Sequence, residues 1–249
     1  EGSALKEIGG GRSSEASGTG AFYRCYALTS VQLPDSLEKI GAFAFEESGL
    51  TEITVPRNVS SLGVGAFASC HELQNIFVDE ANENYTDTDG VVYLSDTTEI
   101  FAYPAGRSAT SYTVSEGVTK IGDCAFYGAW NLVNVALPSG LETVGEFGFY
   151  DCRNIQGYEL PESLTFIERY AFAQNSSLAS LYIPDNVIQI SNYAFAYDYR
   201  CSSIYLNDTS KLPRISFAAF AYTGITSVRV PPHVSTIAQY AFEGCPSLR

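Results

Sequence analysis

A repeat of about 23 residues runs along the sequence and limits the folds that the chain can adopt. Counting from an aliphatic residue as position zero, a landmark Phe falls at +5, and apolar residues follow at +11, +14, +16, +20 and +23. The landmark Phe, usually preceded by Ala, recurs at Phe22, Phe45, Phe67, Phe126, Phe149, Phe172, Phe195, Phe220 and Phe242. A unit this short cannot enclose a core alone, so it buries its apolar columns by stacking on neighbours. The sequence therefore predicts a repeat solenoid.

Each repeat contains one segment with the pattern of a strand. In "SLYIP" (180–184) and "SVRVP" (227–231) apolar and polar residues alternate, which is the period of a half-buried strand. Pro lacks an N–H, so it marks the point where pairing ends. The "AF" segment is too short for a long helix. We expect a mostly β solenoid with short 3₁₀ or turn segments and one continuous parallel sheet whose strands lie about 4.8 Å apart.

Two segments interrupt the repeat. Residues 9–19, "GGRSSEASGTG", have the Gly and Ser content of a loop insert. Residues 79–113 form a second insert, in which "GVVYL" and "EIFAYP" are separated by "SDTT" and predict a β-hairpin. After it, Val118 and Ile121 return the chain to register. We therefore expect one repeat domain over residues 1–249 with two inserts.

The repeat itself resembles a known family. The segments "IGAFAFEESGLTEITVPRNV" and "IGDCAFYGAWNLVNVALPSGL" are similar to the BspA-type leucine-rich repeat, and "ENYTDTDGVVYLSDTTEIFAYPAG" is similar to the hairpin insertion common in that family. The resemblance implies a leucine-rich-repeat superhelix. It also implies a secreted or surface-displayed protein that acts as an adhesin toward host matrix glycoproteins or other cells.

Charge and hydropathy exclude several classes of partner. The formal net charge is −14 with only 14 Lys plus Arg, which argues against nucleic acid and against an anionic membrane surface. No run of 18 apolar residues is present, so we expect no direct insertion into a membrane by this segment. The chain contains no Met and stops in mid-pattern at "CPSLR", from which we expect a fragment of a longer precursor.

The six cysteines do not predict a disulfide framework. Four of them occupy one column, three residues after the landmark Phe, and the adjacent repeats hold Ser, Ala or Asn at or beside that place. Same-column residues two repeats apart lie about 10 Å apart, whereas a disulfide needs Cα atoms within about 7 Å. We expect small buried thiols that act as weak hydrogen-bond donors. The residues are Cys25, Cys70, Cys124, Cys152, Cys201 and Cys245.

Few residues suggest chemistry. The only histidines, His71 and His233, lie near no nucleophile motif, and no phosphate-binding or zinc motif is present. We expect no enzyme activity, no cofactor and no metal site. One alternative stays open: the acids crowded in the 79–113 insert include "DTDG", which resembles part of a Ca²⁺ loop but lacks its other ligands.

Four Asn-x-Ser/Thr sequons occur, at Asn58, Asn84, Asn175 and Asn207. Asn175 stands in the cysteine column, so we expect its side chain to turn inward and bond backbone groups. Asn84 and Asn207 are the glycosylation candidates if the source is eukaryotic.

The column at +15 is not fixed by burial and should point to the outer face of the sheet. Aromatic residues and Arg, which are enriched at interfaces, recur in it. We predict a partner-binding face from this column, with the candidate residues Phe77, Glu159, Tyr182, Tyr205 and Arg229. The alternative is that same-column aromatics such as Tyr182 and Tyr205 stack on each other and only stabilise the sheet.

These observations favour a non-enzymatic recognition or adhesion module, extracellular or on the cell surface, that binds a protein or glycoprotein. Host matrix or neighbouring surface proteins are the partners that the resemblance implies. A structural spacer or assembly subunit of a larger surface complex is the second reading.

Overall fold

The computed structural model describes residues 4–11 and 20–249, and these residues form two compact units. Unit 1 comprises Glu1–Ser108 with Asp123–Ala129, and unit 2 comprises Ala109–Gly122 with Trp130–Arg249. The described residues contain short strands and turns and no helix. Residues 12–19, most of the expected 9–19 loop insert, lie outside the described part. The expectation of a single domain over 1–249 stays a prediction.

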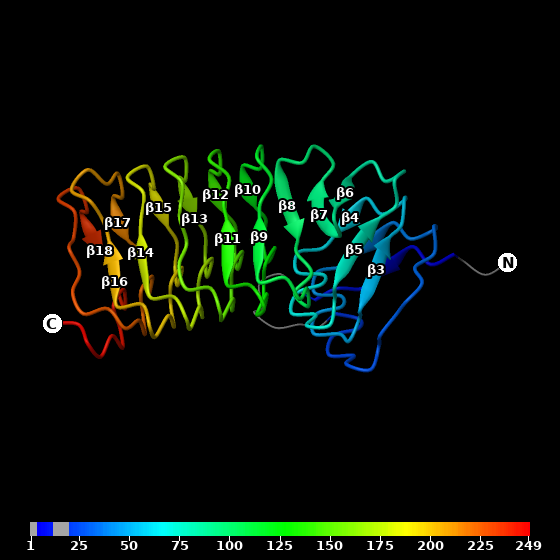
Figure 1. Cartoon of the computed structure of the whole chain (residues 1–249), viewed down its shortest axis with the longest axis horizontal. Helices are drawn as coiled ribbons and strands as arrows, with labels where there is room; N and C mark the ends of the chain where they lie inside the picture. The colour runs from blue at the N-terminus through cyan, green and yellow to red at the C-terminus, as the bar shows by residue number, and fades with distance from the viewer. Residues whose placement is uncertain (1–3, 12–19) are drawn as a thin grey trace. The chain divides into compact units, whose positions relative to one another are not determined.

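Unit 1 consists of stacked repeats and the 79–113 insert (Figure 1). Two-residue strands that end at position zero of each repeat pair in parallel: β1 (Glu7–Ile8), β2 (Lys39–Ile40) and β4 (Ser61–Leu62). A second row lies at the predicted strand segment, where β3 (Glu52–Val55) pairs in parallel with β5 (Asn75–Val78).

The insert forms an antiparallel meander. The predicted hairpin is confirmed, because β7 (Val91–Leu94) pairs with β8 (Glu99–Ala102). A third strand that the sequence did not reveal, β6 (Tyr85–Thr88), pairs with the other edge of β7. The insert also supplies Tyr103, whose ring stacks on Phe126 at 4.9 Å between centroids and so takes the place of a landmark Phe.

Unit 2 repeats the same two rows. At position zero, four strands pair in parallel in the order β10 (Lys120–Ile121), β12 (Thr143–Val144), β13 (Phe166–Ile167) and β15 (Gln189–Ile190). Nearer the C-terminus β17 (Arg214–Ile215) pairs with β18 (Thr236–Ile237). In the second row, parallel pairs join β9 (Ser111–Thr113) to β11 (Asn134–Ala136) and β14 (Ser180–Tyr182) to β16 (Ser203–Tyr205).

The solenoid is confirmed, but the expected single continuous parallel sheet is wrong. Each unit holds two rows of short strands in several separate sheets, and the meander is antiparallel. The physical reason is that a repeat turns its backbone sharply twice, so each extended stretch is only two to four residues long. The "AF" segment forms turns.

The landmark Phe residues form a stacked column inside each unit. In unit 2 the centroids of consecutive rings lie 5.5, 5.3, 5.4 and 5.7 Å apart, from Phe149 through Phe172, Phe195 and Phe220 to Phe242. In unit 1 Phe22, Phe45 and Phe67 stack in the same way. Each ring therefore covers the ring of the next repeat, which is why one repeat alone cannot fold.

The turn after position zero uses left-handed backbone. In most repeats the residues at +3 and +7 have positive φ, for example Phe147 (φ 56°) and Asp151 (φ 58°). This conformation costs a non-Gly residue roughly 1–2 kcal/mol. It aims the N–H groups at +3, +5 and +7 at carbonyls of the next repeat: Phe147 N donates to Arg169 O (3.0 Å), Phe149 N to Ala171 O (2.7 Å) and Asp151 N to Ala173 O (3.0 Å). Hydrogen bonds between repeats offset the backbone cost.

All six cysteines are free thiols, and four of them are buried as predicted, whereas Cys25 and Cys245 are only partly buried. The thiol of Cys70 donates to Phe45 O at 3.0 Å, and that of Cys245 donates to Phe220 O at 3.2 Å. Asn175 in the same column is fully buried, and its Nδ2 donates to Phe172 O at 2.6 Å. The inward orientation predicted for Asn175 is therefore confirmed.

Candidate functional site

The second row of strands in unit 2 carries the exposed tyrosines. Tyr182 on β14 and Tyr205 on β16 are register partners with 39% and 57% of their surface exposed. Their rings do not stack on each other, and neither contacts another aromatic ring of the described residues. The alternative that these two rings stabilise the sheet by stacking is therefore not what the structure shows. Both rings remain partly exposed to solvent.

A hollow of about 550 Å³ lies beside Tyr182 on this face. Its lining includes the +13 residues of three successive repeats, Asn134, Gly157 and Ser180. It also includes the +15 residues of these repeats, of which Tyr182 is the largest and Glu159 carries the charge. The predicted residues Glu159 and Tyr182 thus line one site, and Tyr205 follows in the next repeat.

The hollow coincides with a gap in the strand row. In the second row, Figure 1 draws arrows for β11 and β14 but none for the repeat between them. That repeat contributes 157–160, "GYEL", whose side chains alternate between exposed and buried like those of a strand. In the described chain, however, no backbone hydrogen bond joins 157–160 to β11 or β14. Main-chain polar groups therefore remain available here.

Carboxylates surround the tyrosine. Burial, followed by the charges of Asp185 and Glu162, raises the pKa of Tyr182. The Tyr182 hydroxyl accepts a hydrogen bond from Asn207 Nδ2 at 2.9 Å, and the same nitrogen donates to Asp185 Oδ1 at 3.1 Å. Glu159 forms no ion pair with any residue that the structure describes. The site therefore presents uncompensated negative charge beside a partly exposed tyrosine ring.

The other two candidates lie apart from the hollow. Arg229 is exposed, and its guanidinium forms an ion pair with Asp208. Phe77 belongs to unit 1, where it is 41% exposed on β5 opposite Thr54. Glu159 and Tyr182 therefore line one hollow and Tyr205 is the register partner of Tyr182, whereas Arg229 and Phe77 do not line that hollow.

Unit 1 has a corresponding hollow of about 500 Å³ in its own second row. It is lined by Glu52, Asp35 and Asp79, among others. Arg57 lies between two of these carboxylates, with Nη2 3.1 Å from Asp79 and Nε 3.8 Å from Asp35. Much of the negative charge of this hollow is therefore already neutralised within the chain.

The two glycosylation candidates are exposed, as that prediction requires. Asn84 lies just before β6, in the insert. The amide of Asn207 is held by Tyr182 and Asp185, so a glycan on it would disturb the Tyr182 hydroxyl. Glycosylation of either residue stays a prediction.

Three aspartates of the insert form hydrogen bonds or ion pairs with other groups of the chain. Asp87 accepts hydrogen bonds from the backbone N–H groups of Val78 (2.7 Å) and Gly90 (3.3 Å), and Asp89 pairs with Arg107. Asp96 accepts from the N–H of Thr98 at 3.0 Å. Among residues 4–11 and 20–249, no group of three or more His, Cys, Asp and Glu side chains could hold a metal ion.

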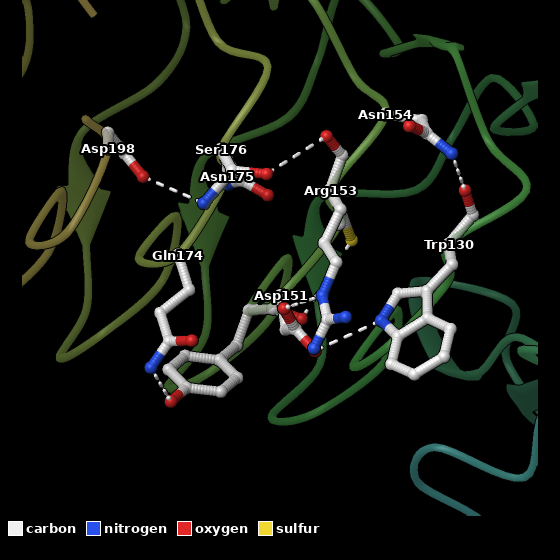
Figure 2. Close-up of polar contacts among 10 residues, drawn as sticks. Trp130, Asp151, Arg153, Asn154, Gln174, Asn175, Ser176 and Asp198 are labelled. Atoms are coloured by element: carbon white, nitrogen blue, oxygen red, sulfur yellow. Dashed lines mark hydrogen bonds and ion pairs between the residues drawn. The ribbon is translucent and has the colours of Figure 1, made fainter. Parts of the chain in front are cut away.

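Sequence reasoning missed a cluster around the only tryptophan (Figure 2). Trp130 Nε1 donates to Asp151 Oδ2 at 3.0 Å, and Arg153 Nε donates to Asp151 Oδ1 at 2.7 Å. The Arg153 guanidinium lies over the Trp130 ring, 4.1 Å from its centroid. Arg153 is thus held between an aromatic ring and a carboxylate. The single Trp was the one sequence signal that could have drawn attention to this place.

None of the described segments forms a helix that is long and apolar enough to cross a membrane.

Comparison with known families gave one clear match. Residues 3–89 and 97–218 match the model of the BspA type leucine-rich repeat region in six copies. A comparison with curated proteins gave no match.

Several solved structures share the fold. A leucine rich cell surface protein from Faecalibacterium prausnitzii is 27% identical with a TM-score of 0.71, and the match covers 90% of this chain and 53% of that one. The pneumococcal vaccine antigen PcpA is 25% identical with a TM-score of 0.68, and the match covers 84% and 56% of the two chains. A leucine-rich repeat protein from Eubacterium ventriosum, 20% identical with a TM-score of 0.67 over 84% and 68%, shows the fold alone. The chain therefore spans little more than half the length of the first and second of these structures.

Proposed function

Because the chain belongs to the BspA-type leucine-rich repeat family, we propose that it is a recognition module at the cell surface or outside the cell. Repeats of this family generally mediate protein interactions, and a similar solved structure is described as a cell surface protein. The partner is a protein or glycoprotein, such as a component of the host matrix or a neighbouring surface protein. It binds through the second strand row of unit 2.

The observation that carries this proposal is the pair of exposed tyrosines on adjacent repeats, of which Tyr182 lines the hollow. Tyr182 and Tyr205 hold large, exposed, unstacked rings at fixed spacing on adjacent repeats. Tyr is enriched among residues that dominate binding energy, because it buries a large area at a small cost in side-chain entropy. A rigid scaffold that presents such rings outward is suited to binding a partner.

The proposed module is not an enzyme. The acids and thiols with the most perturbed pKa values, Asp198, Cys70 and Cys201, are buried in the two cores. None of these groups lines the hollow beside Tyr182, where a substrate would have to reach them.

The test is binding to purified matrix glycoproteins, measured by surface plasmon resonance, and adhesion to cultured cells. Replacing the pair by Tyr182→Ala and Tyr205→Ala should weaken capture at least tenfold, which corresponds to about 1.4 kcal/mol. Tyr199→Ala is the matched control, because Tyr199 is an exposed tyrosine of unit 2 that does not line the hollow. Unchanged capture by the double variant, with an unchanged melting temperature, would remove this face as the binding site and favour the structural spacer.

A further inference from the structure

We propose that the hollow between β11 and β14 receives an arginine or lysine side chain on an extended segment of the partner protein. This inference rests on the proposed function and specifies the chemistry of its ligand.

The charge of the hollow selects a cation. The Glu159 carboxylate lines the hollow and has no ion-pair partner among the described residues. Glu162 and Asp185 add negative charge around Tyr182. The basic side chains farther along are already engaged: Arg229 with Asp208, and Lys211 with the Asn186 side chain at 2.7 Å. An incoming cation therefore meets free carboxylate, whereas an anion is repelled, in a chain whose net charge is already −14.

Unit 2 already contains the arrangement that this cation would complete. Arg153 lies between the Trp130 ring and the Asp151 carboxylate. In the hollow, Tyr182 supplies a partly exposed ring and Glu159 supplies a carboxylate, both from the +15 column of adjacent repeats. The hollow thus offers the same two groups, ring and carboxylate, without the arginine. A guanidinium or ammonium placed there gains a cation–π contact and an ion pair together.

In the corresponding hollow of unit 1, two of the lining carboxylates are already paired with a cation of the chain. There, Arg57 lies between Asp35 and Asp79, so the chain supplies its own cation. No basic residue belongs to the lining of either hollow. In unit 2 the lining carboxylate Glu159 stays unpaired among the described residues and is available to an external basic group.

The main chain favours a peptide as the carrier of that group. Segment 157–160 makes no backbone hydrogen bond to β11 or β14, and Gly157 and Glu159 are exposed. An extended peptide can bond such unpaired N–H and C=O groups while its alternate side chains enter pockets. The hollow also falls within the size range of ligand pockets, about 300–1,000 Å³.

The test uses fluorescein-labelled nine-residue peptides of Gly and Ser with Arg at alternate positions. The matched probe carries citrulline, a neutral isostere, in place of Arg, and a third probe carries Glu. Fluorescence anisotropy at low salt should show the Arg peptide binding about five- to tenfold more tightly than the citrulline peptide, and the Glu peptide binding least.

Glu159→Gln should abolish the preference for Arg over citrulline. The matched control is Glu142→Gln, which changes the net charge equally at an exposed carboxylate that does not line the hollow, and which should retain the preference. Equal binding of Arg and citrulline peptides, or an equal loss in both variants, would overturn the inference.

Two further outcomes separate this inference from the proposed function. If neutral oligosaccharides bind the wild type and Tyr182→Ala removes that binding while Arg peptides bind no better than citrulline peptides, the cation is wrong and the recognition face stands. If the double tyrosine variant captures the purified glycoproteins normally and the Arg preference persists, the hollow binds cations but the proposed face is wrong.

Discussion

The backbone N–H of Asn175 donates a hydrogen bond of 2.8 Å to Oδ1 of Asp198, and both side chains are fully buried in unit 2. At two positions of their column the side chain donates to the landmark Phe carbonyl three residues earlier. Asn175 Nδ2 bonds Phe172 O at 2.6 Å, and Thr223 Oγ1 bonds Phe220 O at 3.0 Å. An ionised Asp198 has no proton to donate, and its Oδ2 has no partner within the described residues.

Asp198 should make the stability of the protein fall as the pH rises. Burial raises the pKa of Asp198 well above its usual range in the folded state, whereas in the unfolded chain an aspartate titrates near pH 4, roughly. From that pH up to the raised folded-state value, the folded protein holds more protons than the unfolded chain, so the free energy of unfolding decreases with pH. Asp198→Asn removes this loss and supplies a donor for Phe195 O.

Thermal unfolding from pH 3 to pH 8 checks this prediction. The variant should match the wild type near pH 3 and be more stable at pH 7 by on the order of 2 kcal/mol. The control is Glu142→Gln, at an exposed carboxylate. A constant difference between Asp198→Asn and wild type at every pH would contradict the prediction.

Phe172→Ala should destabilise the chain by about 3–5 kcal/mol, the usual cost of truncating a buried Phe. Phe172 is fully buried and stacks on Phe149 and Phe195, so its loss leaves a void in the column. Denaturant unfolding measures the change. Phe166→Ala, at a 36% exposed ring, should cost under about 1 kcal/mol and serves as the control. Similar costs for the two variants would mean that the column is not the core of unit 2.

Arg153→Ala should loosen the tryptophan cluster. It removes the cation over the Trp130 ring and leaves the buried Asp151 carboxylate with fewer partners, at a cost of about 1–2 kcal/mol. Since Trp130 is the only tryptophan, its fluorescence reports the change directly. We expect emission shifted to longer wavelength and stronger quenching by acrylamide. Arg153→Lys, which keeps the charge but not the planar fork, should show part of the effect; an unchanged spectrum in Arg153→Ala would rule out the cluster.

Two classes of thiol should be distinguishable by reaction rate. Burial raises the pKa of Cys70 to about 11 and that of Cys201 to about 12, so little reactive thiolate exists at pH 8. Cys25 and Cys245 are part-exposed. We expect Ellman's reagent to modify these two quickly in the folded protein and the remaining four only after denaturation. Uniform reaction of all six thiols would contradict the burial of Cys70, Cys124, Cys152 and Cys201. Cys25→Ser with Cys245→Ser should remove the fast phase.

The sequence predicts the parts of this fold that depend on burial. The stacking of Phe149 on Phe172 follows from a period that only shared burial maintains, and the inward Asn175 follows from its column. The two rows of strands do not follow, because a two-residue strand such as Lys39–Ile40 is too short to show alternation. The absence of strand pairing at 157–160 could not be predicted from the sequence either, since "GYEL" alternates between apolar and polar residues as a strand does.

The binding face was only partly predictable. The column of Glu159, Tyr182 and Tyr205 can be read from the repeat, but ring orientation cannot, so stacking and open faces remained alternatives. The cluster of Trp130 with Asp151 joins residues 21 positions apart whose columns differ, and no periodicity links them.

The left-handed turn has a consequence for how such a protein changes length. The three hydrogen bonds from positions +3, +5 and +7 involve main chain only, so any repeat can make them with any other whatever its side chains. Duplication or deletion of a gene segment that encodes one 23-residue repeat would therefore preserve these main-chain hydrogen bonds between the repeats on either side. The length of the solenoid and the number of exposed +15 positions can therefore differ among related proteins that keep the same fold.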